Sequence, residues 1–528
     1  MAYVDDTALA GTGASQGANI VGYKQMGTSA VNRTAMSKMR ETVHVADFGA
    51  KGDYSTDDTV AIQAAINACP AGGTVLFDGG FVEGQGGDYK VTSTLNITRH
   101  VNLEGKNSRI VGVMRNTATD LIRVQPAAEI RNWTCRGLVL SFNSNGRDAL
   151  SIGNGTVGFL HAIIESCNIN SGAGGFGIRF SGVGTHLNTV RNCVISGTTF
   201  AENAITKTPE RGGIMLAGAD GTQIYDNELM GKGCGIVVGL VNGSFKTEIV
   251  RNAIVSRDVG VYLNQAQQVD IVSNQFEQGL GNQESEGNPN YNKATYKGHV
   301  VVFGSGVYSS GEEVRDCIIS RNNFGNGSNG AFGVYLVAYS RDNVIDENYF
   351  ASAPAGGADI YIGSPTVLYT RIGNRNRVGG VRAGIARGSA NSIDPKTLLL
   401  ANDFGTGTYG YAARKTPVLA SGYTGSAQFA VWKDEDDRLV LDGSIVVSSG
   451  ATVTPGTTIL TLPDGMRPAD QQLISVPNTV SPNASMLIVN TNGTVTSGSN
   501  VNANSTLFVG AASSITIRGR VSYLSGPF

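Results

Sequence analysis

Long apolar runs are absent from this sequence. No stretch approaches the roughly eighteen consecutive apolar residues that a membrane-spanning helix requires. The opening residues "MAYVDDTALAGTG" also lack the basic segment and apolar core that mark a secretory signal peptide. We therefore expect a protein that has no membrane partner and is not exported through a signal peptide.

Charge of either sign is scarce. Charged residues make up 16% of the chain, the formal net charge is −2, and no block of like charges occurs. Proteins that bind nucleic acid or anchor to anionic membranes concentrate cations on one segment or face. The composition therefore argues against a nucleic-acid partner and against a polybasic membrane anchor.

Paired cysteines are also missing. The six cysteines stand singly, without the C-x-x-C spacing of zinc and redox sites. We interpret them as buried, reduced thiols of a protein that folds in a reducing cytosol. We expect no metal ion and no other cofactor.

Glycine, in contrast, is abundant. The chain has 71 glycines, while aromatic residues make up only 7%. Frequent glycine suits many tight turns between short strands better than long helices with charged outer faces. The composition predicts an all-β protein.

Two short patterns repeat through the middle of the chain. The first is apolar, any residue, Asn, any residue, apolar, at intervals of about 25 residues. Its asparagines are Asn192, Asn227, Asn252, Asn274, Asn322, Asn348 and Asn376, with Cys167 in the same register one repeat earlier. The second is usually glycine, apolar, any residue, apolar, and one copy falls between each successive pair of asparagines. It begins at Gly177, Gly213, Gly235, Gly260, His299, Gly333 and Asp359.

This strict alternation of two strand types is typical of a parallel β-solenoid, in which each coil stacks on the last. The recurring Asn has a structural explanation, since Asn tolerates a left-handed φ and stacked amides can hydrogen-bond from coil to coil. We therefore predict an asparagine ladder with no catalytic role.

The flanking segments differ from the repeat. Residues 56–70 predict one helix, with Thr56 as N-cap and Pro70 as its stop, which would cover the open first coil. After about residue 387 the repeat fades, and residues 417–528 show short strands separated by turn signals, which predicts an antiparallel sandwich. The acidic run 433–438 suits a solvated hairpin tip better than a calcium site.

Residues 40–80 closely resemble the opening of pectate-lyase-like parallel β-helix proteins, and especially that of bacteriophage tailspikes. The matching elements are "VADFGAKGD" from Val45, "TDDTVAIQAAI" from Thr56 and "GGTVLF" from Gly72. The preceding segment looks like the one with which many tailspikes dock onto the virion. The phrase "TTILTLPDGMRPA" from Thr457 resembles terminal β-domains of phage tail fibres and spikes.

The resemblance implies a homotrimer of right-handed parallel β-helices that recognises, and usually cleaves, a bacterial capsule or O-antigen polysaccharide. It implies a place in the virion tail, with the N-terminus bound to the baseplate or another tail protein. Such a protein folds in the host cytoplasm and acts at the bacterial cell surface. The implied domains are a docking segment (1–40), the capping helix and β-helix (41–390), a linker (391–416) and a C-terminal sandwich for trimerisation or carbohydrate binding (417–528).

Tailspike active sites vary, so the site has to be located from the repeat itself. Two intervals are lengthened at the same corner, by residues within 196–213 and 278–298, while the corners at 230–235 and 255–260 are short. The two insertions lie three coils apart, about 14 Å by strand spacing. They would form the walls of a groove.

The floor of this groove would be the outward residue of each glycine-pattern strand. These residues are Arg179, Met215, Val237, Tyr262, Val301, Tyr335 and Tyr361. Exposed tyrosines stack on sugar rings, although a loop or a trimer neighbour could equally cover them. Each corner along this edge carries a cation, which favours an acidic polysaccharide; solvated loop charges explain the same cations. The predicted binding residues are Glu210, Arg211, Lys232, Arg257, Tyr262, Tyr291, Lys293, Tyr296 and Tyr335.

Glycoside hydrolysis needs two carboxyl groups about 5 to 9.5 Å apart, which corresponds to one or two coils. Asp258 at a short corner meets this spacing with carboxylates of the next corner, which are Glu277, Glu284 and Glu286. We predict Asp258 with Glu284 or Glu286 as acid and base of an endo-glycosidase. Other carboxylates held in reserve are Glu202, Glu210, Glu312 and Glu313.

Three alternatives remain. A polysaccharide lyase acting by β-elimination would need a base and a charge neutraliser, for which Tyr296, Lys293 and His299 are available. A non-catalytic receptor-binding spike could use the same groove for adhesion alone. A cellular pectate lyase is disfavoured by the missing signal peptide and by the C-terminal phrase.

Overall fold

The computed structural model divides the chain into two compact units. The first comprises Met1–Asn343 with Phe350–Tyr361, and the second comprises Val344–Tyr349 with Ile362–Phe528. The structure describes residues 6–13, 15–78, 87–143, 145–155, 159–197, 209–231, 233–239, 243–256, 259–278, 298–304, 312–325, 332–351, 358–364, 366–373, 375–378, 381–382, 385–387, 398–399, 417–425, 430–433, 439–447, 456–463, 471–476, 485–498 and 514–521.

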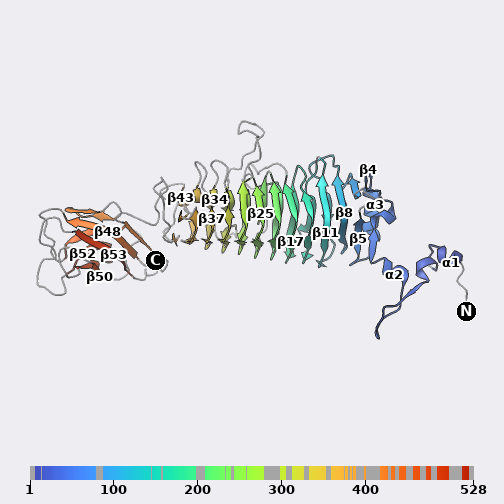
Figure 1. Cartoon of the computed structure of the whole chain (residues 1–528), viewed down its shortest axis with the longest axis horizontal. Coiled ribbons are helices and arrows are strands. Elements are labelled where there is room, and N and C mark those ends of the chain that lie inside the picture. The colour runs from blue at the N-terminus through green and yellow to red at the C-terminus, as the bar shows by residue number, and fades with distance from the viewer. Residues whose placement is uncertain are drawn as a thin grey trace. The chain divides into compact units, whose positions relative to one another are not determined.

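The first unit is a parallel β-helix, which confirms the predicted fold class (Figure 1). One face is a long parallel sheet with one strand from each coil, here called the long sheet. Its strands are β7 (Leu95–Ile97), β9 (Ile122–Val124), β12 (Leu150–Gly155), β16 (Phe176–His186), β19 (Gly212–Asp220), β22 (Cys234–Val238), β26 (Val259–Leu263), β30 (Gly298–Phe303), β34 (Phe332–Ala338) and β38 (Ala358–Ile362).

Two further strands per coil complete the wall. The first set is β3 (Thr42–His44), β5 (Thr74–Asp78), β8 (Asn102–Gly112), β11 (Thr134–Phe142), β14 (Ile163–Glu165), β17 (Thr189–Arg191), β20 (Gln223–Tyr225), β24 (Glu248–Val250), β28 (Asp270–Val272) and β32 (Ile318–Ser320). The second set is β4 (Asp53–Asp57), β6 (Gly87–Val91), the later parts of β8 and β11, β15 (Asn168–Asn170), β18 (Val194–Gly197), β21 (Glu228–Gly231), β25 (Ala253–Ser256), β29 (Gln275–Gln278) and β33 (Asn323–Phe324). Strands β10 (Ile130–Arg131), β13 (Phe159–Leu160), β23 (Ser244–Phe245), β27 (Ala266–Gln267), β31 (Val314–Arg315) and β35 (Ser340–Arg341) add short parallel pairs.

The register of the long sheet confirms the predicted glycine pattern. Strand pairing aligns Ile178, Ile214, Ile236, Val261, Val300 and Val334, and all six side chains are buried in the core. Glycine precedes most of them because the next coil approaches closely. A Cβ atom on Gly235 would lie 2.5 Å from the carbonyl oxygen of Gly260, which is closer than real Cβ atoms come.

The predicted asparagine ladder is also present, with one correction. Asn252 accepts from the backbone N–H of Asn227 at 3.0 Å, and its own N–H donates to Asn274 at 2.9 Å. The register places Cys193, not Asn192, beside Asn227. Asn192 has φ 53° and lies one position earlier.

The left-handed φ at this corner therefore belongs to the residue that precedes each ladder position. Asp226, Arg251, Ser273 and Arg321 all have φ between 55° and 57°. The ladder asparagine supplies the buried amide. We predicted that one Asn would provide both the left-handed φ and this amide, but two neighbouring residues provide them.

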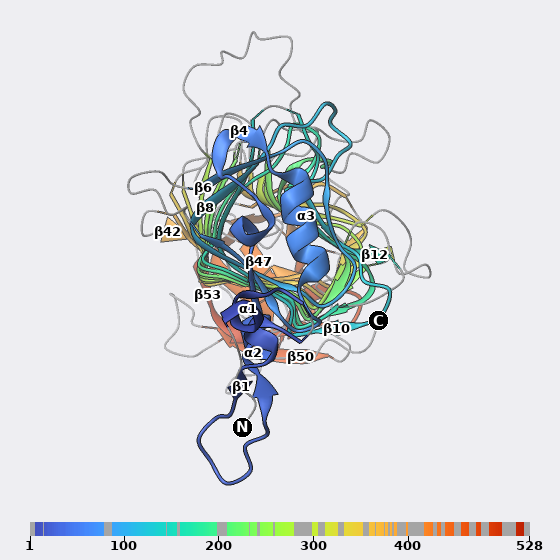
Figure 2. The ribbon, with the colours of Figure 1, turned by 90° about the vertical axis from the view of Figure 1, so that its right-hand side faces the viewer.

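The capping helix is α3 (Thr59–Ala68), whose N-cap Asp58 lies two residues after the predicted N-cap, Thr56. Residues 53–57 form β4, and the Asp58 carboxylate accepts from the N–H groups of Lys51 and Gly52. The helix buries Ile62, Ala65 and Ile66 against the end of the coils (Figures 1 and 2). The Gln63 amide pairs with both backbone groups of Asn96 in β7, at 2.8 and 2.9 Å.

Short elements precede the β-helix. They are α1 (Asp6–Ala10), the 3-10 helix η1 (Gly17–Asn19), the antiparallel pair β1 (Gly22–Tyr23) and β2 (Arg33–Thr34), α2 (Ala35–Met39) and the 3-10 helix η2 (Val45–Phe48). Thr34 caps α2 through its side chain. The virion-docking role of this segment stays a prediction.

The second unit begins with the parallel strands β36 (Val344–Asp346), β40 (Arg371–Ile372) and β44 (Leu398–Leu399) and the antiparallel hairpin β41 (Arg377–Val378) with β42 (Val381–Arg382). Its C-terminal part has an antiparallel sheet of β45 (Val418–Leu419), β49 (Thr458–Thr461), β52 (Thr494–Ser497), β51 (Ser485–Val489) and β50 (Gln472–Val476). A second antiparallel sheet has β46 (Tyr423–Gly425), β48 (Leu439–Val447), β47 (Ala430–Lys433) and β53 (Ser514–Val521). Strands β50 and β53 are in contact. This arrangement confirms the predicted antiparallel C-terminal region. The acidic residues 434–437 lie outside the described residues.

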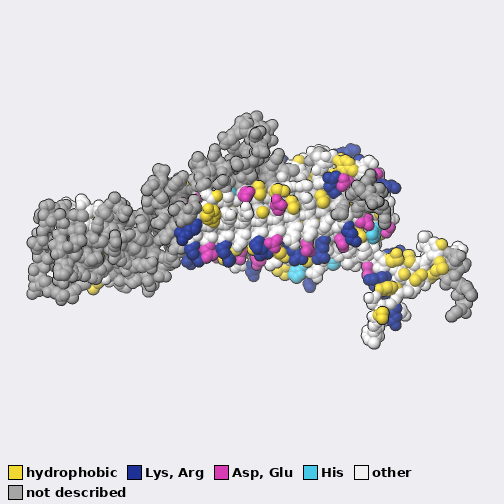
Figure 3. Space-filling model, in the orientation of Figure 1, with side chains coloured by type: hydrophobic (Ala, Val, Ile, Leu, Met, Phe, Trp, Pro, Cys, Tyr) yellow, Lys and Arg dark blue, Asp and Glu magenta, His cyan; other side chains and the backbone are white. Residues whose placement is uncertain are grey.

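All six cysteines are buried and free, as predicted. Within the described part of the chain, no helix is long and apolar enough to cross a membrane. Figure 3 shows Lys and Arg side chains beside Asp and Glu side chains along the lower edge of the coils. Ion pairs such as Arg251 with Asp226, at 2.8 Å, join neighbouring coils at the surface.

Candidate functional site

The two insertions start from one corner of the β-helix, as predicted. Strands β18, β21, β25 and β29 are successive neighbours, and each leads into a strand of the long sheet. The first insertion joins β18 to β19 and the second joins β29 to β30, three coils apart. Several predicted site residues lie outside the described residues, namely Lys232, Arg257, Asp258, Glu284, Glu286, Tyr291, Lys293 and Tyr296.

The predicted floor has the expected register but is not exposed in its middle coils. Strand pairing aligns Arg123, Ser151, Arg179, Met215, Val237, Tyr262, Val301 and Tyr335 in one outward row. Tyr262 is only 1% exposed and contacts Phe303 edge to face, with ring centroids 6.5 Å apart. The expectation that Tyr262 offers an open face to a sugar is therefore wrong for this conformation.

One end of the outward row carries an aromatic cluster, formed by Phe332, Tyr335 and Tyr361. Phe332 stacks on Tyr361 at 4.3 Å between centroids, and Tyr335 meets both rings edge to face at 4.8 and 5.0 Å. Tyr335 and Tyr361 are half-buried. Their partly open rings can stack on sugar rings, and the sugar-binding role of Tyr335 stays a prediction.

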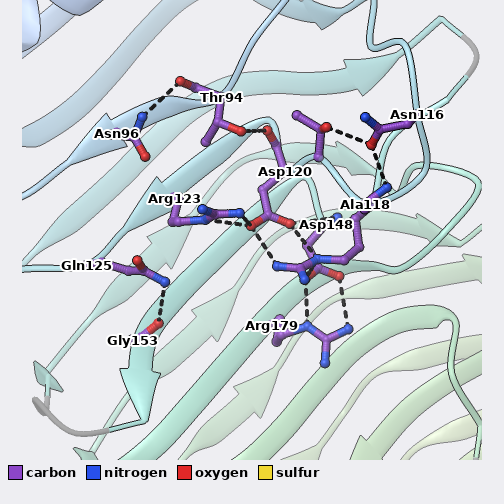
Figure 4. Close-up of polar contacts among 12 residues, drawn as sticks. Thr94, Asn96, Asn116, Ala118, Asp120, Arg123, Gln125, Asp148, Gly153 and Arg179 are labelled. Carbon is purple, nitrogen blue, oxygen red and sulfur yellow. Dashed lines mark hydrogen bonds and ion pairs between the residues drawn. The ribbon is translucent and has the colours of Figure 1, made fainter.

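The other end carries an arginine cluster, formed by Arg123, Arg147 and Arg179 around the fully buried carboxylates of Asp120 and Asp148. Figure 4 labels Arg123 and Arg179 with the two carboxylates. Arg147 donates twice to Asp120, at 2.7 Å each, and contacts Asp148 at 3.1 Å. Arg123 donates to Asp120 at 2.9 Å, and Arg179 to Asp148 at 2.6 Å.

The electrostatics of this cluster favour the charged state of Arg147. Burial opposes the charge on Arg147, but its hydrogen bonds and the charges of Asp148 and Asp120 outweigh that effect and raise its pKa. Arg179 also lies over the ring of Phe176, 5.1 Å from its centroid. The guanidinium groups are held in place by acceptors that cannot reach solvent.

Three predicted residues at the walls are described. Glu277 is exposed on β29 and accepts from Gln275 at 2.7 Å. The register pairs Ser256 with Gln278, so Glu277 and the corner that contains Asp258 belong to adjacent coils. Glu210 is exposed and Arg211 half-buried just before β19, at the end of the first insertion.

His299 is not available as a catalytic base. It is 2% exposed and lies beside the stacked rings of Phe276 and Phe324, with ring centroids 5.8 and 5.6 Å away. Burial lowers its pKa to about 4, and its Nε2 lies 3.1 Å from the carbonyl oxygen of Gly325. The sequence pattern had placed it at a glycine position, where its side chain enters the core.

Glu313, a reserve carboxylate, has a structural role. It is 2% exposed and accepts from Arg341 at 2.9 Å. A second cation, Arg315, lies 3.6 Å away. Within the described ranges, no group of three or more His, Cys, Asp or Glu side chains could hold a metal ion.

A second carboxyl pair lies on the first-set strands, where sequence reasoning did not place a site. Glu248 and Asp270 are register partners in adjacent coils, about 5 Å apart by strand spacing. Burial, and then the charge of Glu248, raise the pKa of Asp270. A pocket beside them is lined by Gln223, Tyr225, Glu248, Val250 and Arg251.

The arginine cluster was also missed, although the sequence carries a signal for it. Asp120 and Asp148 are 28 residues apart, which is one coil. The Asn and Gly patterns are absent in these early coils, so the sequence pattern does not predict their register. The register aligns Arg123, Ser151 and Arg179, which places two cations two coils apart on the outward row.

Comparisons with known proteins match parts of the chain. A family model described as the periplasmic copper-binding protein NosD matches residues 161–312. Mannuronan C5-epimerase AlgE3 of Azotobacter vinelandii is 36% identical over 115 residues, which are 20% of this chain and 6% of that protein. The tail spike protein of an Escherichia phage is 34% identical over 96 residues, 18% of this chain and 11% of that protein. The alignments thus span a small part of each curated relative.

A solved structure matches nearly the whole chain by fold. The Dettilon tailspike protein (gp208) superimposes with a TM-score of 0.54 at 16% sequence identity, covering 92% of this chain and 96% of that chain. At this identity the likeness shows the fold. It confirms the resemblance to tailspike β-helices at that level.

Proposed function

We propose that this chain, which shares the parallel β-helix fold of the Dettilon tailspike protein, is a phage tailspike that recognises and depolymerises a bacterial capsule or O-antigen polysaccharide. The observation that carries this proposal is the outward row of the long sheet. It bears an arginine cluster at one end and a half-buried aromatic cluster at the other, beside the corner from which both insertions start.

These features suit a carbohydrate polymer. Aromatic faces stack on sugar rings, and guanidinium groups bind the oxygens of anionic substituents. One named relative, a mannuronan epimerase, supports the same class of ligand, and another, a phage tail spike, supports the place in a phage tail. A polymer is long enough to contact several coils at once.

We further propose cleavage within the polysaccharide chain by an endo-glycoside hydrolase mechanism. One carboxylic acid protonates the glycosidic oxygen, while a second carboxylate attacks the anomeric carbon or activates water. Asp258 with Glu284 or Glu286 remains the predicted pair, and Glu277 remains the other candidate partner of Asp258. Glu248 with Asp270 is the alternative pair, because the two residues are register partners in adjacent coils and the pKa of Asp270 is raised.

A lyase mechanism is the runner-up. It would use Tyr296 and Lys293, because His299 is buried in the core. A non-catalytic receptor-binding spike would bind the same polymers and cut none of them.

The test is incubation of the full-length protein with a panel of purified capsular polysaccharides and O-antigens. New reducing ends without ultraviolet absorbance of an unsaturated uronate indicate a hydrolase, and both signals together indicate a lyase. Binding with no release of oligosaccharides from any polymer would contradict the enzyme proposal.

Isosteric variants then locate the catalytic pair. Loss of cleavage with binding retained in Asp258→Asn, Glu284→Gln or Glu286→Gln supports the predicted pair. The same loss in Glu248→Gln and Asp270→Asn moves the site to the first-set strands. Glu129→Gln, at a side chain 49% exposed, is the matched control and should cleave at the wild-type rate.

A further inference from the structure

The arginine cluster contains more cations than its buried carboxylates need. Asp120 and Asp148 carry two negative charges at 0% exposure, while Arg123, Arg147 and Arg179 carry three positive charges. Two buried carboxylates require two cationic partners, and Arg123 on Asp120 with Arg179 on Asp148 already provide them. Arg147 is therefore a surplus cation, and the cluster has a net charge of +1.

The surplus charge is rigid and faces solvent. Arg147 is 36% exposed and Arg123 is 32% exposed. Their Nε and Nη2 groups are bound to Asp120. Among the residues that the structure describes, the Nη1 groups of both arginines have no hydrogen-bond partner. The cluster thus presents donors whose orientation is fixed before any ligand arrives, which lowers the entropic cost of binding.

Position links the cluster to the outward row. Arg123 and Arg179 lie in the same row as the aromatic cluster, two coils apart and separated by Ser151. Five strand pairings lead from β16 to β34, or about 24 Å by strand spacing. A polymer running along the coils could contact both ends of the row.

We propose that the arginine cluster is a binding subsite for an anionic group of the polysaccharide, so that the natural ligand is an acidic polymer. This inference rests on the proposed polysaccharide binding and adds the class of polymer. The anionic group is either a sugar carboxylate or a phosphodiester, since guanidinium groups bind both.

The test variant is Arg147→Gln. It removes the surplus charge and leaves each buried carboxylate with one arginine, so the coils should stay folded. Arg123→Gln is the second variant, because Arg147 would still donate twice to Asp120. The matched control is Arg131→Gln in β10, outside the arginine cluster. It removes the same charge from a side chain that is 72% exposed and paired with Glu129.

The probe is an array of purified bacterial capsular polysaccharides and O-antigens, both acidic and neutral. Each uronate-containing polymer is also printed after chemical reduction of its carboxyl groups. Each polymer with a phosphodiester-linked side group is also printed after removal of that group by dephosphorylation, which leaves the backbone intact. We expect wild-type protein to bind an acidic polymer at least tenfold more tightly than its neutralised form. Arg147→Gln should lose at least tenfold in affinity for the acidic form only, and Arg131→Gln should match wild type.

The outcomes separate this inference from the proposed function. Sensitivity to carboxyl reduction identifies a carboxylate, and sensitivity to dephosphorylation identifies a phosphodiester. Binding to neutral polymers only, or equal binding by a folded Arg147→Gln or Arg123→Gln variant, overturns the inference and leaves the proposed function standing. If the wild-type protein binds no polymer on the array, both fall together.

Discussion

The ladder asparagines show how one buried side chain can join three coils. Asn252 accepts from Asn227, and its Nδ2 group donates to the carbonyl oxygen of Ile224 at 2.8 Å and to the Asn274 amide at 3.0 Å. A buried amide in this position satisfies groups that would otherwise be left without partners. The ladder therefore stabilises the stack of coils and has no catalytic duty.

Substitution of a ladder residue tests this role. In Asn252→Ala, the carbonyl group of Ile224 and the N–H of Asn227 lose buried partners, so we expect the barrier to unfolding or the free energy of unfolding to fall by about 2–4 kcal/mol. Denaturant unfolding measures the change. The control is Asn323→Ala, at an exposed asparagine beside the ladder, which should stay within about 0.5 kcal/mol of wild type. Equal effects of the two substitutions would contradict the assignment.

The buried histidine predicts a dependence of stability on pH. His299 has a pKa of about 4 in the folded chain and about 6.5 when unfolded. Between these values the unfolded state binds more protons, so the stability is fully present above pH 6.5 and falls as the pH drops toward 4. The loss is about 3 kcal/mol per chain, since each pKa unit corresponds to about 1.4 kcal/mol.

A neutral ring in the same place should remove this dependence. His299→Phe keeps a ring beside the stacked pair of Phe276 and Phe324. The stability of this variant should vary less between pH 6.5 and 4 than that of wild type. Parallel denaturation series at the two pH values give the comparison. An unchanged pH slope in the variant would show that other groups control acid unfolding.

Residue identity alone could not settle which of these side chains point inward. Tyr262 and His299 each occupy the predicted position in the repeat, and both side chains are buried. The exposure of Tyr262 depends on what covers the outward row, and that of His299 depends on whether its side chain turns into the core. The sequence pattern also does not show which of two adjacent corner residues has the left-handed φ and which one belongs to the asparagine ladder. Asn192 fits either position by its chemistry, and only strand pairing assigns it.

The insertion between β29 and β30 is predicted to form one wall of the binding groove, and a loop replacement tests this role. Replacing residues 279–297 with a short corner such as the "SRDVG" of 256–260 should leave the coils folded, because β29 and β30 pair with both neighbours. Polysaccharide binding or cleavage should be abolished, as measured on the same panel of polymers.

A replacement at a different corner is the control for that variant. Residues 305–311 follow the long-sheet strand β30 instead of preceding it. Shortening them should leave binding at the wild-type level. Full activity of the 279–297 variant would move the site away from this wall.

The strands of the middle coils were predictable because period, glycine and asparagine agree there. The strands of the early coils were not predictable, because β9 and β12 carry neither marker. The same absence explains why the cluster around Asp120 and Asp148 was not predicted. The start of α3 was misplaced for a local reason. The carboxylate of Asp58 is engaged by Lys51 and Gly52, and Thr56 belongs to β4.

For the whole molecule, the prediction that matters most is the homotrimer. Light scattering of the full-length protein should give three times the chain mass of 55.0 kDa. If the C-terminal region trimerises the chain, removal of residues 417–528 should lower this mass to that of one chain. A full-length monomer at micromolar concentration would contradict the prediction.

Assembly could not be derived from the sequence pattern in the way the coils were. Repeats specify contacts between neighbouring coils of one chain, which explains why the long sheet was predicted strand by strand. Contacts between copies leave no periodic signal. The trimer therefore rests on resemblance, and so does the docking role of residues 1–40.

The pairing of Gln63 with Asn96 has a consequence for how the protein behaves in a crowded cell. A parallel sheet that ends in unpaired N–H and C=O groups is a template on which another chain can polymerise. The amide of Gln63 occupies both groups of Asn96, as the next strand would. The capping helix thereby closes the first edge of the long sheet, so that a stack built by repetition does not extend from this end into a fibre.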